Sequence, residues 1–127
     1  MKTRNNCSVL VVEDETIVAF DIRKSVERLG YHVTGTAATG EKAVELASRF
    51  RPDLVLMDIS LAGEMNGIEA ALKIRTEYGA KIVFLSAFDD DKTVDRMKDI
   101  GMAGFITKPF HETELKLTLG ELLGPAG

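Results

Sequence analysis

Residues 8–14 read Ser-Val-Leu-Val-Val-Glu-Asp and residues 53–58 read Asp-Leu-Val-Leu-Met-Asp, and these two stretches decide the fold. Each is a short, nearly unbroken apolar run that ends at a carboxylate. Strands buried on both faces of a parallel sheet have this composition, whereas half-exposed strands alternate apolar and polar residues. The two stretches therefore predict central strands of a parallel sheet.

Three further runs of β-branched or apolar residues extend this pattern along the chain. The five predicted strands are Ser8–Val12, His32–Thr36, Asp53–Met57, Lys81–Leu85 and Gly104–Ile106. Segments in which apolar residues recur at helical spacing lie between them. Alternating strands and helices predict an α/β fold with right-handed crossovers, in which helices cover both faces of a five-stranded parallel sheet.

The predicted helices are recognised by apolar residues that recur every three or four positions. The expected inward stripes are Val18, Ile22, Val26 and Leu29 in the first helix, Ala43, Ala47 and Phe50 in the second, and Ile68, Ala71 and Leu72 in the third. A fourth helix around Asp89–Ile100 has a weaker stripe, and a fifth runs from about His111 to Leu123. Thr39 is the expected N-cap of the second helix, and Gly30 is expected to stop the first.

The bulk composition describes one ordinary globular domain. The chain has 127 residues, 45% of them hydrophobic and 28% charged, so we expect residues 1–127 to form one domain with a core from about residue 8 to residue 123. A net charge of -4 without any basic run longer than two residues argues against direct nucleic-acid binding. The apolar runs are too short to cross a membrane, and the single Cys7 suits a reducing compartment, so a cytoplasmic location is expected.

Polar residues closely follow four of the five predicted strands. They are Glu13 and Asp14 after the first, Asp58 after the third, Ser86 after the fourth and Lys108 after the fifth. The carboxyl ends of parallel strands meet at one edge of an open sheet, where binding sites lie. Phosphoryl transfer to a carboxylate needs such a set: an acceptor acid, further acids to hold a divalent cation, a lysine and a hydroxyl.

Four short segments carry a resemblance to a known family: Val-Val-Glu-Asp-Glu, Met-Asp-Ile, Leu-Ser-Ala and Thr-Lys-Pro-Phe. Their order resembles the receiver domain of two-component response regulators, and the likeness runs from about Val9 to Leu123. It implies a flavodoxin-like (CheY-like) sheet with strand order 2-1-3-4-5. It also implies a phosphoprotein of a phosphorelay, which takes a phosphoryl group from a sensor histidine kinase or a histidine phosphotransfer protein.

The resemblance assigns a role to each polar residue at the strand ends. Asp58 would be the phospho-acceptor, and Glu13, Asp14 and Asp58 would hold Mg²⁺, or Mn²⁺ as an alternative, together with the backbone carbonyl of Ser60. Lys108 would contact the phosphoryl group. The resemblance thus implies a signalling domain rather than an enzyme, whose chemistry is limited to its own phosphorylation and slow autodephosphorylation.

The resemblance also implies a switch. Ser86 would bond a phosphoryl oxygen and Phe105 would change rotamer, so that the fourth helix, fifth strand and fifth helix signal to a partner protein. The Lys108–Pro109 peptide is expected to be cis, as in the family. Homodimerisation through the fourth and fifth helices is left open, as are the cognate kinase and the output.

Three positions depart from the commonest family pattern. Glu13 replaces the more frequent Asp, and Ser86 replaces Thr. The segment from Asp58 to Gly67 lacks the usual proline at Ala62 and is one residue longer than the commonest spacing, which resembles receivers attached to sensor kinases. The resemblance also implies that Ser60 and Phe88, each two residues past a site residue, flank the path of an attacking water and tune the lifetime of the phosphoryl group.

Three alternative functions are weighed against the receiver. A haloacid-dehalogenase-like phosphatase also uses an aspartate nucleophile and magnesium, but it has a second Asp where this chain has Ser60. A docking module that keeps the fold without phosphorylation would have no need of the acids and the lysine. A flavodoxin-like cofactor binder would need a glycine-rich phosphate loop after the first strand, which is absent here.

Overall fold

The computed structural model describes residues 7–59, 61, 65–86 and 91–124. Its sheet has five parallel strands in the order β2-β1-β3-β4-β5, as predicted. The strands are β1 (Ser8–Val12), β2 (His32–Ala37), β3 (Leu54–Asp58), β4 (Lys81–Ser86) and β5 (Gly104–Thr107). The third strand begins one residue later than predicted and includes Asp58, because Asp58 still pairs with Leu85 of β4.

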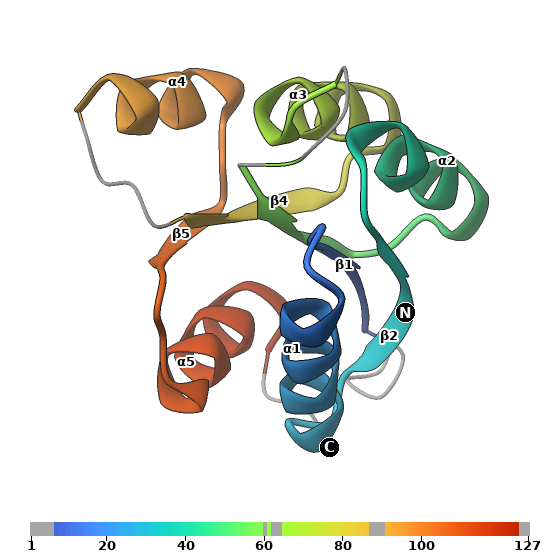
Figure 1. Ribbon diagram of the computed structural model, residues 1–127, viewed down its shortest axis with the longest axis vertical. Helices are drawn as coiled ribbons and strands as arrows, with labels where there is room; N and C mark the ends of the chain where they lie inside the picture. Colours follow the sequence, from blue (N-terminus) through green and yellow to red (C-terminus); the bar gives the residue numbers. More distant parts are fainter. Residues whose placement is uncertain (1–6, 60, 62–64, 87–90, 125–127) are drawn as a thin grey trace.

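In the described residues, five helices alternate with the strands and cover the sheet in two layers. They are α1 (Thr16–Arg28), α2 (Gly40–Phe50), α3 (Gly67–Tyr78), α4 (Asp91–Ile100) and α5 (Glu112–Leu123). Figure 1 shows α1 and α5 on one face of the sheet and α2, α3 and α4 on the other. None of the helices in the described part of the chain combines the length and the apolar composition needed to cross a bilayer.

The three central strands are buried on both faces, which explains their unbroken apolar composition. Successive side chains of a strand point to opposite faces. Toward α2, α3 and α4 point Leu10, Val12, Val55, Met57, Ile82 and Phe84. Toward α1 and α5 point Val9, Val11, Leu54, Leu56, Val83 and Leu85. The sheet therefore separates two apolar cores rather than covering one.

Local signals fix where several helices begin and end. The Thr39 hydroxyl accepts a hydrogen bond from the Lys42 N–H at 3.1 Å, so the predicted N-cap of α2 is confirmed. Asn66 and Glu69 form a reciprocal capping box at the start of α3. Gly30 follows α1 with a φ of 97°, a left-handed conformation that suits glycine. The Lys108–Pro109 peptide is cis, as predicted.

Two of the predicted inward-facing residues are in fact exposed. Phe50 is 47% exposed and Leu72 is 49% exposed. Leu46 takes the inward position of α2, and Phe50, the last residue of that helix, lies beside the Arg49 guanidinium. In α3 the inward positions belong to Ala70, Ala71 and Ile74, which turns Leu72 outward because successive helical residues are about 100° apart.

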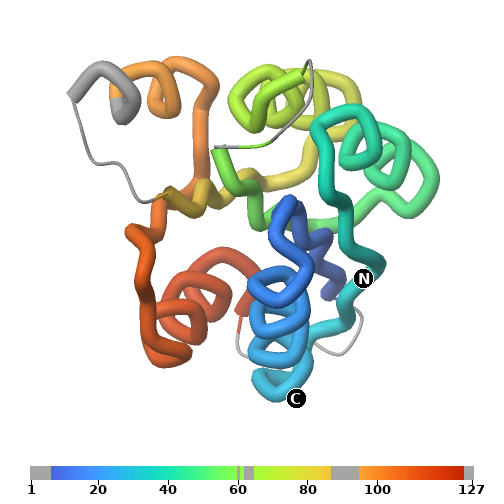
Figure 2. Tube along the Cα trace, viewed as in Figure 1, coloured from blue at the N-terminus to red at the C-terminus, as the bar shows by residue number. Residues whose placement is uncertain are grey.

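Segments from the two ends of the chain lie side by side. Figure 2 shows α1 and α5 next to each other on one face of the sheet. Arg28 of α1 forms an ion pair with Glu112 of α5 at 2.7 Å. At the other end of α5, the buried Tyr31 hydroxyl donates to the Gly124 carbonyl at 2.9 Å. The last helix is therefore held at both of its ends by residues from the first third of the chain.

The contrast between buried and exposed phenylalanines can be tested by truncation. Phe84 is fully buried in the core beneath α2, α3 and α4, so we expect Phe84→Ala to lower the free energy of unfolding by about 3–5 kcal/mol. The matched control Phe50→Ala removes a half-exposed ring and should cost less than about 1 kcal/mol. Urea denaturation of the three proteins measures both values, and equal losses would contradict the assignment of Phe50 to the surface.

Candidate functional site

Three carboxylates meet at the carboxyl edge of the sheet. Glu13 and Asp14 directly follow β1, and Asp58 is the last residue of the neighbouring strand β3. Each offers an oxygen, and these oxygens all lie within 4.8 Å of one another. Glu13 is 2% exposed and Asp58 is 4% exposed, whereas Asp14 is half-buried. Parallel pairing of β1 and β3 thus produces the convergence that the sequence predicted.

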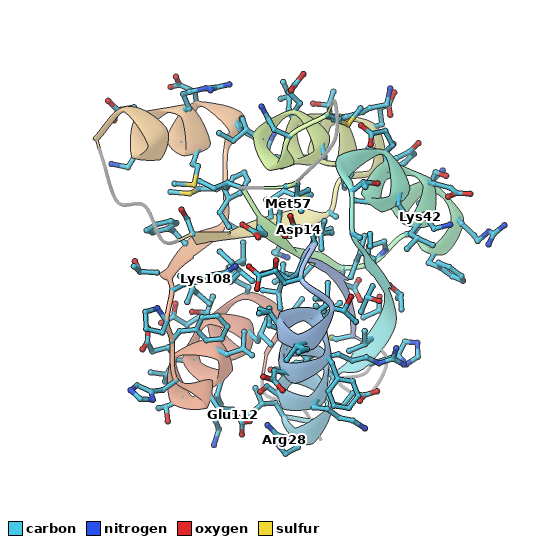
Figure 3. The ribbon with its side chains drawn as sticks, in the orientation of Figure 1. Asp14, Arg28, Lys42, Met57, Lys108 and Glu112 are labelled. Atoms are coloured by element: carbon cyan, nitrogen blue, oxygen red, sulfur yellow. The ribbon has the colours of Figure 1, made fainter. Side chains whose placement is uncertain are left out.

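Lys108 joins this cluster from the turn after the edge strand β5. Its Nζ lies 2.6 Å from the Glu13 Oε1 and 3.3 Å from the Asp58 Oδ2. The residue follows β5, and its backbone N–H donates to the Ser86 carbonyl at 2.8 Å, which ties the turn to the end of β4. Figure 3 labels Lys108, near β5, and Asp14, near β1. One ammonium group therefore bridges two buried carboxylates.

The remaining residues predicted for the site fall into two groups. Ser86 is the last residue of β4 and is 1% exposed, and Phe105 lies half-buried on β5 and packs against the core beneath α2, α3 and α4. Ser60 and Phe88, which were predicted to tune the lifetime of the phosphoryl group, lie outside the described residues, as do residues 62–64 of the loop after β3.

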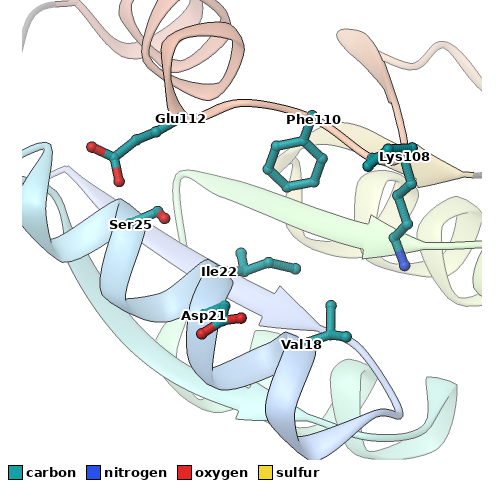
Figure 4. A pocket seen from close by; sticks show the side chains of 8 residues that line it. Val18, Asp21, Ile22, Ser25, Lys108, Phe110 and Glu112 are labelled. Carbon is teal, nitrogen blue, oxygen red and sulfur yellow. The ribbon is translucent and has the colours of Figure 1, made fainter.

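An apolar cavity of about 540 Å³ lies beside Lys108 and was not found from the sequence. It lies between α1 and the turn that links β5 to α5, and Val18, Ile22 and Phe110 provide its apolar lining (Figure 4). The helix beside it also exposes two large side chains, Ile17 at 78% and Phe20 at 57%. Neither of them lines this cavity, but Phe20 lines a second, smaller pocket together with Glu13 and Asp14. Apolar residues at positions 17 and 20, outside the inward stripe of the first helix, are the sequence signal that could have revealed the exposed apolar surface of α1.

The ionisation of Glu13 is strongly disturbed by its surroundings. Burial raises the pKa of this carboxyl from 4.5 to about 7; hydrogen bonds with Asp58 and Asp14 also raise it, and the Lys108 ammonium opposes them. For Lys108, burial lowers the pKa, but the hydrogen bond to Glu13 and the charges of Asp58 and Glu13 outweigh burial and raise it. Lys108 is thus held in its charged form. Its positive charge does not offset the full cost of ionising the buried Glu13 carboxyl.

The donor set fits a hard divalent cation. Carboxylate oxygens are the ligands that Mg²⁺ and Mn²⁺ prefer, and two of the three acids are buried where uncompensated negative charge is costly. Among the residues that the structure describes, Lys108 is the one cation that contacts the cluster, so one positive charge stands against three acids. A cation held by Glu13, Asp14 and Asp58 would remove that imbalance.

Comparison with known proteins identifies the family. The family model of the response regulator receiver domain matches residues 9–119. The chain is 38% identical over 107 residues to the transcriptional regulatory protein PdtaR of Mycobacterium tuberculosis, a match that covers 84% of this chain and 52% of that protein. It is 34% identical over 115 residues to the chemotaxis protein CheY of Thermotoga maritima, covering 90% and 95% of the two chains. The chain therefore spans about half the length of PdtaR and nearly all of CheY.

A solved structure shows the same architecture. The receiver domain of the sensor histidine kinase PA1611 from Pseudomonas aeruginosa PAO1 matches with a TM-score of 0.83 and 33% identity, over 94% of this chain and 98% of that one. That structure is described with a magnesium ion coordinated in its active site cleft.

The raised pKa of Glu13 predicts a pH dependence of stability. The folded state binds this proton more tightly than the unfolded chain, so the contribution is complete below pH 4.5 and is lost as the pH rises to about 7. The difference between the two pKa values corresponds to about 3 kcal/mol. In metal-free buffer, we expect the free energy of unfolding of the wild type to fall by about 2–3 kcal/mol relative to Glu13→Gln over this pH range.

Urea denaturation at a series of pH values measures this difference. Glu121→Gln, which changes an exposed acid of α5, is the matched control and should follow the wild type at every pH. Parallel curves for the wild type and Glu13→Gln would contradict the prediction.

Proposed function

The chain belongs to the response regulator receiver family, and from this premise we propose that Asp58 accepts a phosphoryl group from a phosphohistidine and so switches a signalling surface. The donor would be a sensor histidine kinase or a histidine phosphotransfer protein. The observation that carries the proposal is the Lys108 ammonium, which bridges the buried Asp58 and Glu13 carboxylates. The family is a signalling domain and not a classical enzyme, and self-catalysed transfer is the only chemistry proposed.

The proposed step exchanges one bond for another. A carboxylate oxygen of Asp58 attacks the phosphorus and forms a P–O bond, while the P–N bond to the donor imidazole breaks and the imidazole leaves with that electron pair. Lys108 lies 3.3 Å from the Asp58 Oδ2, so its ammonium is placed to donate to a phosphoryl oxygen arriving there. Catalysis then consists of positioning and charge compensation.

We propose Mg²⁺ as the cation of the acid cluster, held by Glu13, Asp14 and Asp58 and, as the family resemblance implies, by the Ser60 carbonyl; Mn²⁺ is the alternative. When bound, the cation supplies positive charge that offsets repulsion between the carboxylates and the phosphoryl oxygens. Two observations support this choice: the donor atoms are all carboxylate oxygens, and the related receiver of PA1611 is described with magnesium in its cleft.

The switch proposed for this chain starts at Ser86. Its side chain is buried at the end of β4, and the backbone N–H of Lys108, which follows the neighbouring strand β5, donates to its carbonyl. A phosphoryl group on Asp58 adds negative charge and strong acceptor oxygens, which would draw the Ser86 hydroxyl toward it. Phe105 on β5 would then repack, and the surface of α4, β5 and α5 would shift between two populated arrangements that a partner protein distinguishes.

The phosphodonor is proposed to dock on α1 beside the acids. A phosphohistidine must approach Asp58 within bonding distance, so its carrier must cover the surface around the carboxyl edge of the sheet. There, α1 exposes Ile17 and Phe20, and an apolar cavity lies between α1 and the turn before α5. Large exposed apolar side chains beside a cavity are typical of a protein interface.

Two broader expectations also stay proposals. We propose that residues 1–127 form a single receiver domain, supported by the family match over residues 9–119. We propose a cytoplasmic location, supported by the single cysteine of the sequence. A docking module without phosphorylation is the alternative to the whole proposal, and the Glu13–Lys108–Asp58 contacts favour the phospho-acceptor.

Incubation with acetyl phosphate tests phosphorylation at Asp58 directly. We expect a phosphoryl adduct on the intact protein in the presence of Mg²⁺, detected by mass spectrometry, and no adduct after chelation of the metal. Asp58→Asn should abolish the adduct because the amide cannot form the acyl phosphate. Asp53→Asn changes an acid at the opposite end of β3 and is the control. Labelling of Asp58→Asn equal to that of the wild type would refute Asp58 as the acceptor.

The docking surface is tested by separating a protein donor from a small one. The donor is whichever phosphorylated sensor kinase or phosphotransfer protein labels the wild type fastest in a panel. Phe20→Ala should slow transfer from that donor at least about tenfold, because interface aromatics carry much of the binding energy, and leave labelling by acetyl phosphate unchanged. Phe50→Ala removes a ring of similar exposure (47%, against 57% for Phe20) from α2 and should change neither rate. An unchanged rate with the protein donor would exclude Phe20 from the interface.

A further inference from the structure

The first turn of α3 lies directly against the backbone of Asp58. Gly67, the first residue of α3, is buried, and a Cβ built on it would lie 2.3 Å from the Asp58 carbonyl oxygen and 2.7 Å from the Ile59 Cα. Real Cβ atoms essentially never approach another heavy atom within 3.0 Å. Only a residue without a side chain fits between the helix and the peptide that follows Asp58.

Both sides of this contact are held by hydrogen bonds. On the strand side, Asp58 pairs with Leu85, and the Ile59 N–H donates to the Leu85 carbonyl at 3.3 Å. On the helix side, the capping box of Asn66 and Glu69 fixes where α3 begins. A side chain at position 67 could therefore be accommodated only by moving hydrogen-bonded backbone, and not by rotating a flexible side chain.

Met65, two residues before α3, is held in the same way. Its N–H donates to the Glu41 Oε1 at 2.8 Å, which ties this residue to the first turn of α2. The start of α3 is thus bonded both within the helix and to a neighbouring helix, and it presses on the end of β3 from a fixed position. If a side chain is added at position 67, we expect the backbone of Asp58 and Ile59, at the end of the strand, to be the part that moves.

We propose that Gly67 is a positioning residue for the phospho-acceptor: its close contact with the Asp58–Ile59 peptide sets the position of the Asp58 carboxylate relative to Glu13 and Lys108. The inference rests on the proposed function of Asp58. The interaction concerned is the packing of the first turn of α3 against the Asp58–Ile59 peptide. Displacing that peptide would change the distance between the carboxylate and Lys108, which is 3.3 Å, and its distances to the other two acids.

Gly67→Ala is the direct test. We expect the folded fraction of this variant to bind Mg²⁺ and to accept the phosphoryl group less well than the wild type. We expect the dissociation constant for Mg²⁺, measured by calorimetry, to rise at least about tenfold. We expect the rate constant of labelling by acetyl phosphate at saturating Mg²⁺ to fall about ten- to a hundredfold, because displacements of about 1 Å have effects of this size. A purely structural role would lower the labelled fraction but leave both constants unchanged.

Gly101→Ala is the matched control. Gly101 follows α4 with a φ of 86°, so alanine there strains the backbone, while the atoms nearest to its Cβ would be those at the end of the flexible Arg75 side chain. This variant should melt at a lower temperature and keep the wild-type constants for Mg²⁺ and labelling. Equal changes in both variants, or unchanged constants in Gly67→Ala, would overturn the proposal.

Two further outcomes are informative. If Gly67→Ala does not fold, Asn66→Ala loosens the start of α3 without adding atoms and should weaken Mg²⁺ binding about two- to threefold; an unchanged dissociation constant would overturn the proposal. If the wild type binds Mg²⁺ but takes no phosphoryl group, the proposed function fails. The dissociation constant of Gly67→Ala for Mg²⁺ is then the measurement that tests the positioning role. A wild type that does neither overturns both.

Discussion

The ion pairs of Lys108 with Glu13 and Asp58 are the interaction on which the arrangement of the site depends. Parallel strands bring their carboxyl ends together, so the acids that end β1 and β3 are forced into proximity while burial removes most of the water around them. Like charges in such a place are costly without a partner. The turn after β5 supplies that partner, and its hydrogen bond to the end of β4 holds the ammonium where the acids meet.

Much of the fold was predictable because burial on both faces leaves a clear mark on composition. The continuous apolar runs of β1 and β3 indicated central strands, and the order of polar residues after successive strands indicated a site at one edge. The convergence of Glu13, Asp14 and Asp58 then followed from parallel pairing alone. The sheet order itself came from the family resemblance, since periodicity does not state which strands are neighbours.

The features that the sequence could not predict depend on how the helices and strands pack against one another in three dimensions. Phe50 and Leu72 were placed inward because helical spacing locates a stripe only to within about one residue, and Leu46 and Ile74 turned out to fill those positions. The pKa of Glu13 depends on how deeply its carboxyl is buried, which no local pattern records. Gly67 could be read as a loop residue, yet its contact is with a peptide nine residues earlier in the chain.

The attachment of the last helix has a practical consequence for engineering. Cys7 and Tyr31 directly precede β1 and β2, at the amino edge of the sheet. Their side chains donate hydrogen bonds to the carbonyls of Leu123 and Gly124, so α5 ends at this edge. Strands of five residues span about 16 Å, which places this end roughly that far from the acid cluster. A fluorescent protein or surface tether fused after Gly124 would thus report on the receiver without crowding its chemistry.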